Sequence, residues 1–317
     1  MKFELTEDQR DFAASLDSLL AASDTVAAAR AWADDDTTPG RALWGRLAEQ
    51  GVNGLLIPED AGGLGASAVE LVIAFEALGR YAVPGPWVES AAFLPAAVAS
   101  PELLGALADG AVGSVATPPH TPYALDADVA EHLFLAADGL LASAVPGERR
   151  TGVDRTRRLF RVTPTTDSTS HEIGDLAAAF DLAALATAAQ LLGCGERLLA
   201  DSVSYVKQRR QFGREIGSYQ AIKHALADVR IALDFARPLV QGAALSLEPR
   251  EVSAAKVAAA DAAYLASRTA LQVHGAIGYT AEFDLSLWIT KVRALVTAWG
   301  TPAHHRARIL DSLVGAR

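Results

Sequence analysis

The amino-acid sequence predicts a mainly α-helical protein with a small β region in the middle of the chain. Apolar residues recur at helical spacing through the first hundred residues, and again from Ile173 almost to the end. Between about Gly110 and Pro164 the pattern changes to short runs, "GSVAT", "HLFLAA", "LLASAV" and "RLFRVTP", separated by Pro, Asp and Gly. Such runs are typical of strands. We therefore expect an N-terminal helical domain at 1–109, a reduced β domain at 110–172 and a C-terminal helical bundle at 173–317.

The N-terminal part contains clear helix boundaries. In "LTEDQRDFAASLDSLLAAS", Thr6 stands three residues before Gln9, the spacing of a capping box at the start of a helix. A later helix is expected to end at Gly51, and another to run from Ser67 to Leu78 and stop at Gly79. The word "GGLG" between them lacks the Lys-Ser/Thr ending of a P-loop, so we do not interpret it as a phosphate loop.

In the C-terminal part, the apolar pattern predicts three long helices at 177–208, 217–245 and 251–276. The segment "SLEPREV" is expected to form a tight link between the second and the third. Cations cluster around the first junction, "YVKQRRQFGREIGSYQAIKHALAD", and Phe-Gly interrupts the helix there. A second basic cluster spans Arg149–Arg158. A basic cluster of this kind usually lies on a face exposed to solvent. It can bind an anion only where the surrounding residues form a site.

The composition excludes several classes of function. A formal net charge of -10 argues against a nucleic-acid partner, because phosphate binding needs a dense basic surface. No uninterrupted apolar run reaches the roughly eighteen residues of a membrane span. The start "MKFELTEDQRDF" lacks the pattern of a secretory signal. Cys194 is the only cysteine, which excludes an internal disulfide and a CxxC metal site and indicates a cytoplasmic protein.

Four segments, in this order, resemble the acyl-CoA dehydrogenase family of flavoproteins: "LTEDQRDF", "LWGRLAEQGVNGLLIPEDAGGLGASAVELVIAFEALGR", "YVKQRRQFGREIGSYQAIKHALADV" and "LQVHGAIGYTAEFDLSLW". The resemblance covers both helical parts and is weak only in the middle. It implies the family fold, in which a β domain lies between an N-terminal helical domain and a C-terminal four-helix bundle.

The resemblance also implies FAD shared across a subunit interface, with one subunit holding the ADP half of a flavin that reacts in its neighbour. An arginine can fork onto pyrophosphate oxygens, and glycine lets the backbone approach a ligand closely. The alternative is a solvated basic helix end with Phe212 in the core, followed further along the chain by an ordinary Gly-terminated helix. His274 is expected to be a packing or capping residue and not a catalyst. The residues that match the family's cofactor contacts are Arg209, Gln211, Phe212, Gly213, Ile216, Tyr219, Gln220, Gln272, Gly275 and Ala276.

The family's catalytic base has no counterpart in this chain. The resemblance places Trp299 and Ala183 at the two alternative positions of the family glutamate, and Ala184 at the position of an arginine that faces the active site. The loop that holds the flavin ring, "TEP-x-AGSD" in the family, is also missing between Thr117 and Ile173. The chain therefore resembles one half of a composite site.

These features lead to the hypothesis of a truncated, non-catalytic subunit of a heteromeric α2β2 acyl-CoA dehydrogenase, like those of actinobacterial steroid side-chain degradation. A full-length homologous subunit would supply the base and bind most of the acyl-CoA, and an electron-transfer flavoprotein is a possible acceptor. One alternative is a self-sufficient homo-oligomer with an unrecognised base such as Glu196. Another is a non-enzymatic protein of this fold that stabilises a partner.

Other reactive residue types are interpreted structurally. His304 and His305 are adjacent on a helix and are expected at the surface. Cys194 lies on an apolar helix face, where a buried inert thiol is expected. Asp126 and Asp128 belong to a group of metal-compatible residues, but their spacing matches no zinc or EF-hand motif.

Overall fold

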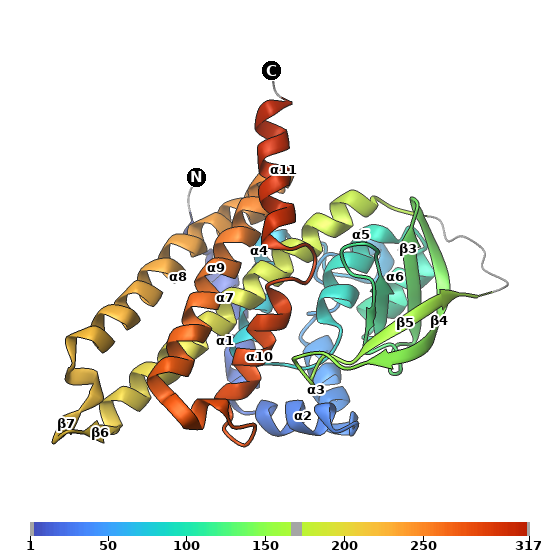
Figure 1. Ribbon diagram of the computed structural model, residues 1–317. Helices are drawn as coiled ribbons and strands as arrows, with labels where there is room; N and C mark the ends of the chain where they lie inside the picture. The colour runs from blue at the N-terminus through green and yellow to red at the C-terminus, as the bar shows by residue number, and fades with distance from the viewer. Residues whose placement is uncertain (1–2, 166–172, 316–317) are drawn as a thin grey trace.

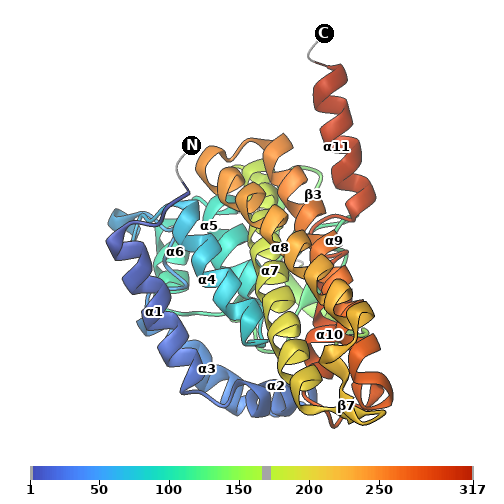
Figure 2. The same ribbon diagram turned by 90° about the vertical axis from the view of Figure 1, so that its left-hand side faces the viewer.

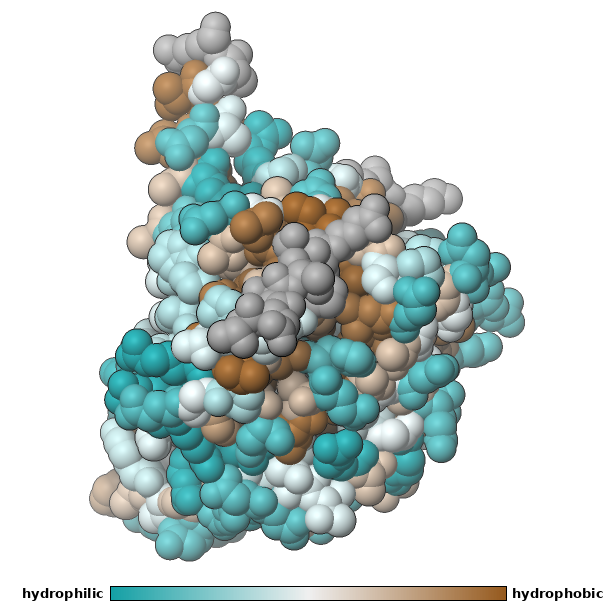
Figure 3. All heavy atoms as spheres, turned by 90° about the vertical axis from the view of Figure 1, so that its right-hand side faces the viewer, coloured by the Kyte–Doolittle hydropathy of each residue, from teal (hydrophilic) through white to brown (hydrophobic). Residues whose placement is uncertain are grey.

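A helical body carries a small sheet on one side (Figure 1). The computed structural model describes residues 3–165 and 173–315. Helices come before and after the strands along the chain, as the sequence predicts. On the face that carries the sheet, hydrophobic residues gather toward the middle and hydrophilic residues dominate the lower and right-hand parts (Figure 3).

The N-terminal helices begin where the capping residues predict. Thr6 and Gln9 form the expected capping box at the start of the first helix, and Ser67 with Glu70 forms another before α4. A single π-helical turn, η2, spans Glu89–Phe93. The helices of this part are α1 (Glu7–Ala21), α2 (Thr25–Ala33), α3 (Thr38–Glu49), α4 (Ala68–Arg80), α5 (Leu94–Ala97) and α6 (Pro101–Ala108).

Gly79 does not end its helix, contrary to the sequence prediction, because α4 continues to Arg80. It instead allows close packing against α7 (Leu176–Gln208), since an added Cβ would collide with the carbonyl oxygen of Gln190. Gly193 on α7 has the reciprocal role, because its Cβ would collide with the carbonyl oxygen of Glu76. These two glycines bring the backbones of α4 and α7 together, and Figure 2 shows the two helices side by side.

The sheet has the order β1-β3-β4-β5-β2, in which β1 runs parallel to β3 and the other neighbours pair antiparallel. A register shift between Pro146 and Arg149 interrupts the pairing of β4 with β5. The predicted strand runs are confirmed, and a short additional strand closes the far edge. The strands are β1 (Gly113–Ala116), β2 (Ala124–Leu125), β3 (His132–Ala137), β4 (Leu140–Arg150) and β5 (Leu159–Pro164).

The C-terminal helices and α4 together enclose α7, whose middle is buried. Among the described residues α7 is the one helix long and apolar enough to cross a membrane, but 72% of its most apolar window is buried in the protein. The predicted tight link is confirmed, with Leu247 at φ 52° between two antiparallel helices. The remaining helices are α8 (Gln220–Ser246), α9 (Pro249–His274), α10 (Leu285–Leu295) and α11 (Pro302–Val314).

Candidate functional site

The segment expected to hold the cofactor is a β-hairpin and not a simple break in a helix. Helix α7 ends at Gln208, and β6 (Arg210–Gln211) then pairs antiparallel with β7 (Arg214–Glu215). Phe212 and Gly213 form the turn, with φ values of 51° and 80°. Positive φ at both central residues is the geometry of a tight two-residue hairpin. A 3-10 turn, η3 (Ile216–Ser218), leads into α8.

The hairpin projects polar and aromatic side chains into solvent. Phe212 is 93% exposed, so in this chain it is not a core residue. Within the described part of the chain, the guanidinium of Arg209 has no ion pair and the side chain of Gln211 has no hydrogen bond. Arg214 lies 3.8 Å from the ring centroid of Tyr219, whose hydroxyl donates to the Gln211 carbonyl at 3.3 Å. The hairpin thus presents a free cation beside exposed aromatic surface.

The second predicted segment lies at the same end of the bundle. Helix α9 ends at His274, and Gly275 has φ 64° with no atom within 4 Å of an added Cβ. The His274 ring stacks on Tyr205 near the end of α7, with centroids 4.2 Å apart. This contact brings the ends of α7 and α9 together, as both ribbon views show (Figures 1 and 2). His274 is therefore a packing residue, as predicted, and burial lowers the pKa of its imidazole.

The other predicted cofactor residues have the exposure that ligand contact requires. The side chains of Gln220, Gln272 and Ala276 are exposed, and Ile216 is half-buried. A hairpin and a helix end therefore offer a guanidinium, amides, an aromatic ring and accessible glycine backbone at one end of the molecule. Such a donor set suits a pyrophosphate linked to a flat ring system.

The two positions matched to the family glutamate are closed by apolar packing. Ala183 and Ala184 are fully buried in α7, and Trp299 is buried in the turn after α10. The Trp299 ring packs against Phe93 at 5.0 Å and against Phe180 at 6.2 Å between centroids. A tryptophan in this packing leaves no place for a carboxylate at that position.

Two buried bases hold the Trp299 turn. Lys256 donates hydrogen bonds to the carbonyls of Leu295 and Val296, both at 3.2 Å, and burial lowers the pKa of its ammonium to about 7. His305 donates from Nε2 to the Trp299 carbonyl at 2.9 Å. The prediction that His305 lies at the surface is wrong, because it is fully buried under α9; burial also lowers the pKa of its imidazole to about 3.

One buried carboxyl group was not predicted as a candidate. Glu89 lies in the π-helical turn, has no exposed surface, and neither of its side-chain oxygens has a hydrogen-bond partner among the described residues. Burial raises the pKa of Glu89 to about 6, although Arg157 and Trp299 lie close enough to favour its charged form. The sequence contains one signal for it, because Glu89 is the only charged residue between Arg80 and Glu102.

Glu196, the alternative base, is engaged in ion pairs. Its carboxylate accepts hydrogen bonds from Arg230 at 2.7 Å and from Arg237 at 2.8 Å. Burial favours the neutral acid, but the hydrogen bonds from the two arginines outweigh it and lower the pKa of Glu196. A carboxylate held ionised by two guanidinium groups is a weak proton acceptor. The Cys194 thiol is buried, as predicted, and burial raises its pKa to about 12.

Comparisons with known proteins agree with this fold over the whole chain. Residues 6–102 match the model of the acyl-CoA dehydrogenase N-terminal domain, and residues 174–314 match that of the acyl-CoA dehydrogenase C-terminal domain. The acyl-CoA dehydrogenase IpdE2 of Mycobacterium tuberculosis is 33% identical over 314 residues, covering 96% of this chain and 94% of the relative.

Two solved structures show the same fold at low identity. The ChsE4-ChsE5 complex of Mycobacterium tuberculosis superimposes with a TM-score of 0.85 at 22% identity, covering 99% of each chain. The structure of a variant of the steroid acyl-CoA dehydrogenase Tcur3481-Tcur3483 superimposes with a TM-score of 0.83 at 23% identity, and the match covers 98% of each chain. Since family models match both helical parts and a relative of similar length aligns almost from end to end, the chain belongs to the acyl-CoA dehydrogenase family.

Proposed function

We propose that this chain is the non-catalytic subunit of a heteromeric, FAD-dependent acyl-CoA dehydrogenase. In this proposal it contributes the ADP half of an interfacial FAD site, and a full-length homologous subunit contributes the catalytic glutamate and the flavin-ring pocket. The observation that carries the proposal is the contrast between two regions. The Arg209 hairpin is exposed and free to bind, whereas Trp299 and Ala183 are buried in apolar packing.

The hairpin residues fit the ADP half of FAD. In this proposal Arg209 would pair with the pyrophosphate. The backbone at Gly275 would be open to the phosphate oxygens, since no atom lies within 4 Å of a Cβ added there. Phe212 offers a flat surface whose exposure would be costly unless a ligand or partner covered it. FAD, when bound, would accept the hydride from the acyl-CoA.

An apolar stripe on α8 supports the requirement for a partner. Ile231, Phe235 and Leu239 follow one another at four-residue spacing on one face of the helix, and Phe235 is 74% exposed. Figure 2 shows α8 on the outside of the bundle. On α11, which projects beyond the body in Figure 1, Leu310 and Leu313 are also exposed. Apolar surface of this extent is typical of an interface.

The relatives suggest the substrate class. One structural neighbour is described as a steroid acyl-CoA dehydrogenase and another as a two-component complex. We infer that the substrate is an acyl-CoA thioester with a bulky ring system, such as a steroid side-chain CoA ester. The complex would work in the cytoplasm as an α2β2 heterotetramer and deliver electrons to an electron-transfer flavoprotein or a similar acceptor.

Expression with and without a full-length homologous subunit from the same organism tests the proposal. We expect the chain alone to be poorly soluble or free of flavin, and the co-expressed pair to elute together with a flavin absorption band that acyl-CoA bleaches. A stable, fully yellow homo-oligomer from single expression would contradict the need for an unlike partner. A soluble complex without flavin would favour a non-enzymatic, partner-stabilising role.

Arg209→Ala is expected to weaken FAD retention by the complex about 10- to 150-fold, because it removes a charge-assisted contact worth roughly 1.5–3 kcal/mol. Flavin release during dilution, followed by fluorescence, measures the effect, and turnover at saturating FAD should stay unchanged. Arg161→Ala is the control, since Arg161 is an exposed arginine on β5, away from the hairpin. Equal FAD affinity in both variants would mean that the cations of the hairpin only face solvent and do not contact FAD.

A further inference from the structure

A small cavity of about 260 Å³ lies between the sheet and α10. Its walls are the loop after β1, the connection from β4 to β5, and α10 with the turn that follows it. Arg157 lines it from the connection, and we call it the Arg157 cavity. Figure 1 shows β4 and β5 on the opposite side of the molecule from β6 and β7, so this cavity is separate from the Arg209 hairpin.

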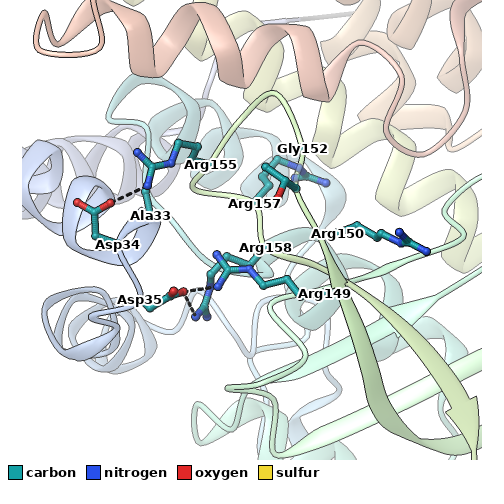
Figure 4. Close-up of a pocket in the computed structure, with 10 residues that line it drawn as sticks. Ala33, Asp34, Asp35, Arg149, Arg150, Gly152, Arg155, Arg157 and Arg158 are labelled. Atoms are coloured by element: carbon teal, nitrogen blue, oxygen red, sulfur yellow. Dashed lines mark hydrogen bonds and ion pairs between the residues drawn. The ribbon is translucent and has the colours of Figure 1, made fainter.

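Most arginines of the second basic cluster already have acidic partners. The connection from β4 to β5 also borders a larger cavity of about 610 Å³, which Figure 4 shows. There Arg155 pairs with Asp34, and Asp35 pairs with both Arg149 and Arg158. The positive charges that face the larger cavity are therefore largely met by carboxylates of the protein itself.

Arg158 has two further partners, and Arg150 has one of its own. The buried guanidinium of Arg158 pairs with Asp126 at 3.0 Å and with Asp128 at 2.7 Å. The two aspartates noted in the sequence thus serve this ion pair. Arg150 pairs with Glu148 at 2.8 Å. Four of the five arginines between positions 149 and 158 are therefore engaged.

Arg157 is the exception. It is half-buried and has neither an ion pair nor a hydrogen bond among the residues that the structure describes, and no dashed line reaches it in Figure 4. Burial raises the pKa of Glu89 and of Asp126, and the charge of Arg157 opposes that rise in both. Neither carboxyl group is bonded to Arg157. Its five N–H donors are thus left for a bound acceptor, without which their partial burial is costly.

The rest of the lining is mainly apolar. Asp154 is buried and pairs at 3.5 Å with Lys291, which lies outside the lining. Arg293 is exposed and donates to the Tyr264 hydroxyl at 2.8 Å. The cavity thus has two guanidinium groups without a carboxylate partner in the described part of the chain, and one carboxylate that is already paired. Its apolar side chains are Pro122, Val153, Leu159, Ala294 and Ala298.

We propose that the Arg157 cavity binds a small apolar carboxylic acid in its ionised form. The planar fork of a guanidinium donates two parallel hydrogen bonds to a carboxylate, and the apolar walls favour a short chain or a ring attached to it. The volume is slightly below the roughly 300–1,000 Å³ of sites for drug-sized ligands, so the acid is small. Phosphate suits the cavity less, because a second negative charge would be buried against apolar walls and near Asp154. This proposal does not rest on the proposed function.

Calorimetric titration of the full-length chain, in the assembly in which it purifies, tests the proposal. The probes are hexanoate and benzoate, their neutral amides hexanamide and benzamide, and inorganic phosphate. We expect each carboxylate to bind at least about tenfold more tightly than its amide, because only the carboxylate accepts charge-assisted hydrogen bonds. From acetate to hexanoate, affinity should rise about fourfold for each added CH₂ that the walls bury. Equal affinity for hexanoate and hexanamide, or for hexanoate and phosphate, would overturn the assignment.

Arg157→Gln is expected to weaken hexanoate binding about tenfold or more and to leave hexanamide binding as it is, since the variant removes the charge and keeps the walls. Arg161→Gln is the matched control. It makes the same charge change at an exposed arginine on β5, outside the cavity, and should bind hexanoate as the wild type does. Equal hexanoate affinity in the wild type and in Arg157→Gln would disprove the site.

Ala294→Leu provides a second test should Arg157→Gln fail to fold. Ala294 is a half-buried residue of α10 in the cavity wall, so a larger side chain there fills part of the space and leaves Arg157 in place. We expect this variant to weaken hexanoate binding more than acetate binding, because the longer chain needs the space. Unchanged hexanoate affinity would overturn the cavity as the site. If the carboxylates bind as expected while the chain fails to pair with a homologous subunit, the carboxylate site stands and the proposed function does not.

Discussion

A complex of this chain with a full-length homologous subunit is expected to lose turnover by about 10²- to 10⁴-fold when the partner's catalytic glutamate is replaced by Gln. The reason is that we find no substitute base in this chain. Trp299 and Ala183 cannot take a proton, and Glu196 is held ionised by Arg230 and Arg237. Acyl-CoA oxidation by the co-expressed complex, with flavin content measured in parallel, checks the result.

Glu89→Gln in this chain is the decisive control. Glu89 has no exposed surface and lines none of the described cavities, so a substrate cannot reach it in this conformation. We expect Glu89→Gln to leave turnover unchanged. A large loss in this variant, with normal flavin content, would instead identify Glu89 as the base and would disprove the non-catalytic assignment.

Gly193→Ala is expected to destabilise the protein by about 1–3 kcal/mol or more, because the new methyl group would collide with the backbone of α4 at Glu76 and Arg80. Denaturant unfolding of the purified complex measures the change. Gly45→Ala is the matched control. Gly45 lies in α3 with no atom within 4 Å of an added Cβ, so the same substitution should stabilise its helix by about 0.5–1 kcal/mol. Equal stability of the two variants would mean that α4 and α7 can separate without cost.

The sequence predicted the parts of the fold that depend on neighbouring residues. Thr6 and Gln9 located a helix start because a capping box is a local arrangement, and the link at Leu247 followed from its short polar surroundings. Gly79 was misinterpreted for the opposite reason. A glycine that ends a helix cannot be told by sequence from one that lets a second helix pack closely. The contact between Gly79 and Gln190 joins residues over a hundred positions apart, so no local pattern reveals it.

The candidate site, too, could be predicted only in those parts that depend on local sequence. The residues of the Arg209 hairpin could be selected from their types and from the family resemblance, but the hairpin itself depends on φ values that the sequence does not reveal. The burial of His305 could not be predicted either, since it depends on α11 packing over α9. Arg158 lies within a basic cluster, yet only the folded chain brings Asp126 and Trp32 to it.

The close contact between α4 and α7 has a consequence for how the chain reaches its native state. The two helices are separated by nearly a hundred residues that include the whole sheet, so the helical body is discontinuous along the chain. Closing such a long loop costs entropy before any packing is gained, which slows folding. During synthesis, the side of α4 that packs on α7 stays uncovered until α7 has left the ribosome. We therefore expect the nascent chain to depend on chaperones, and truncated products that end before residue 208 to aggregate.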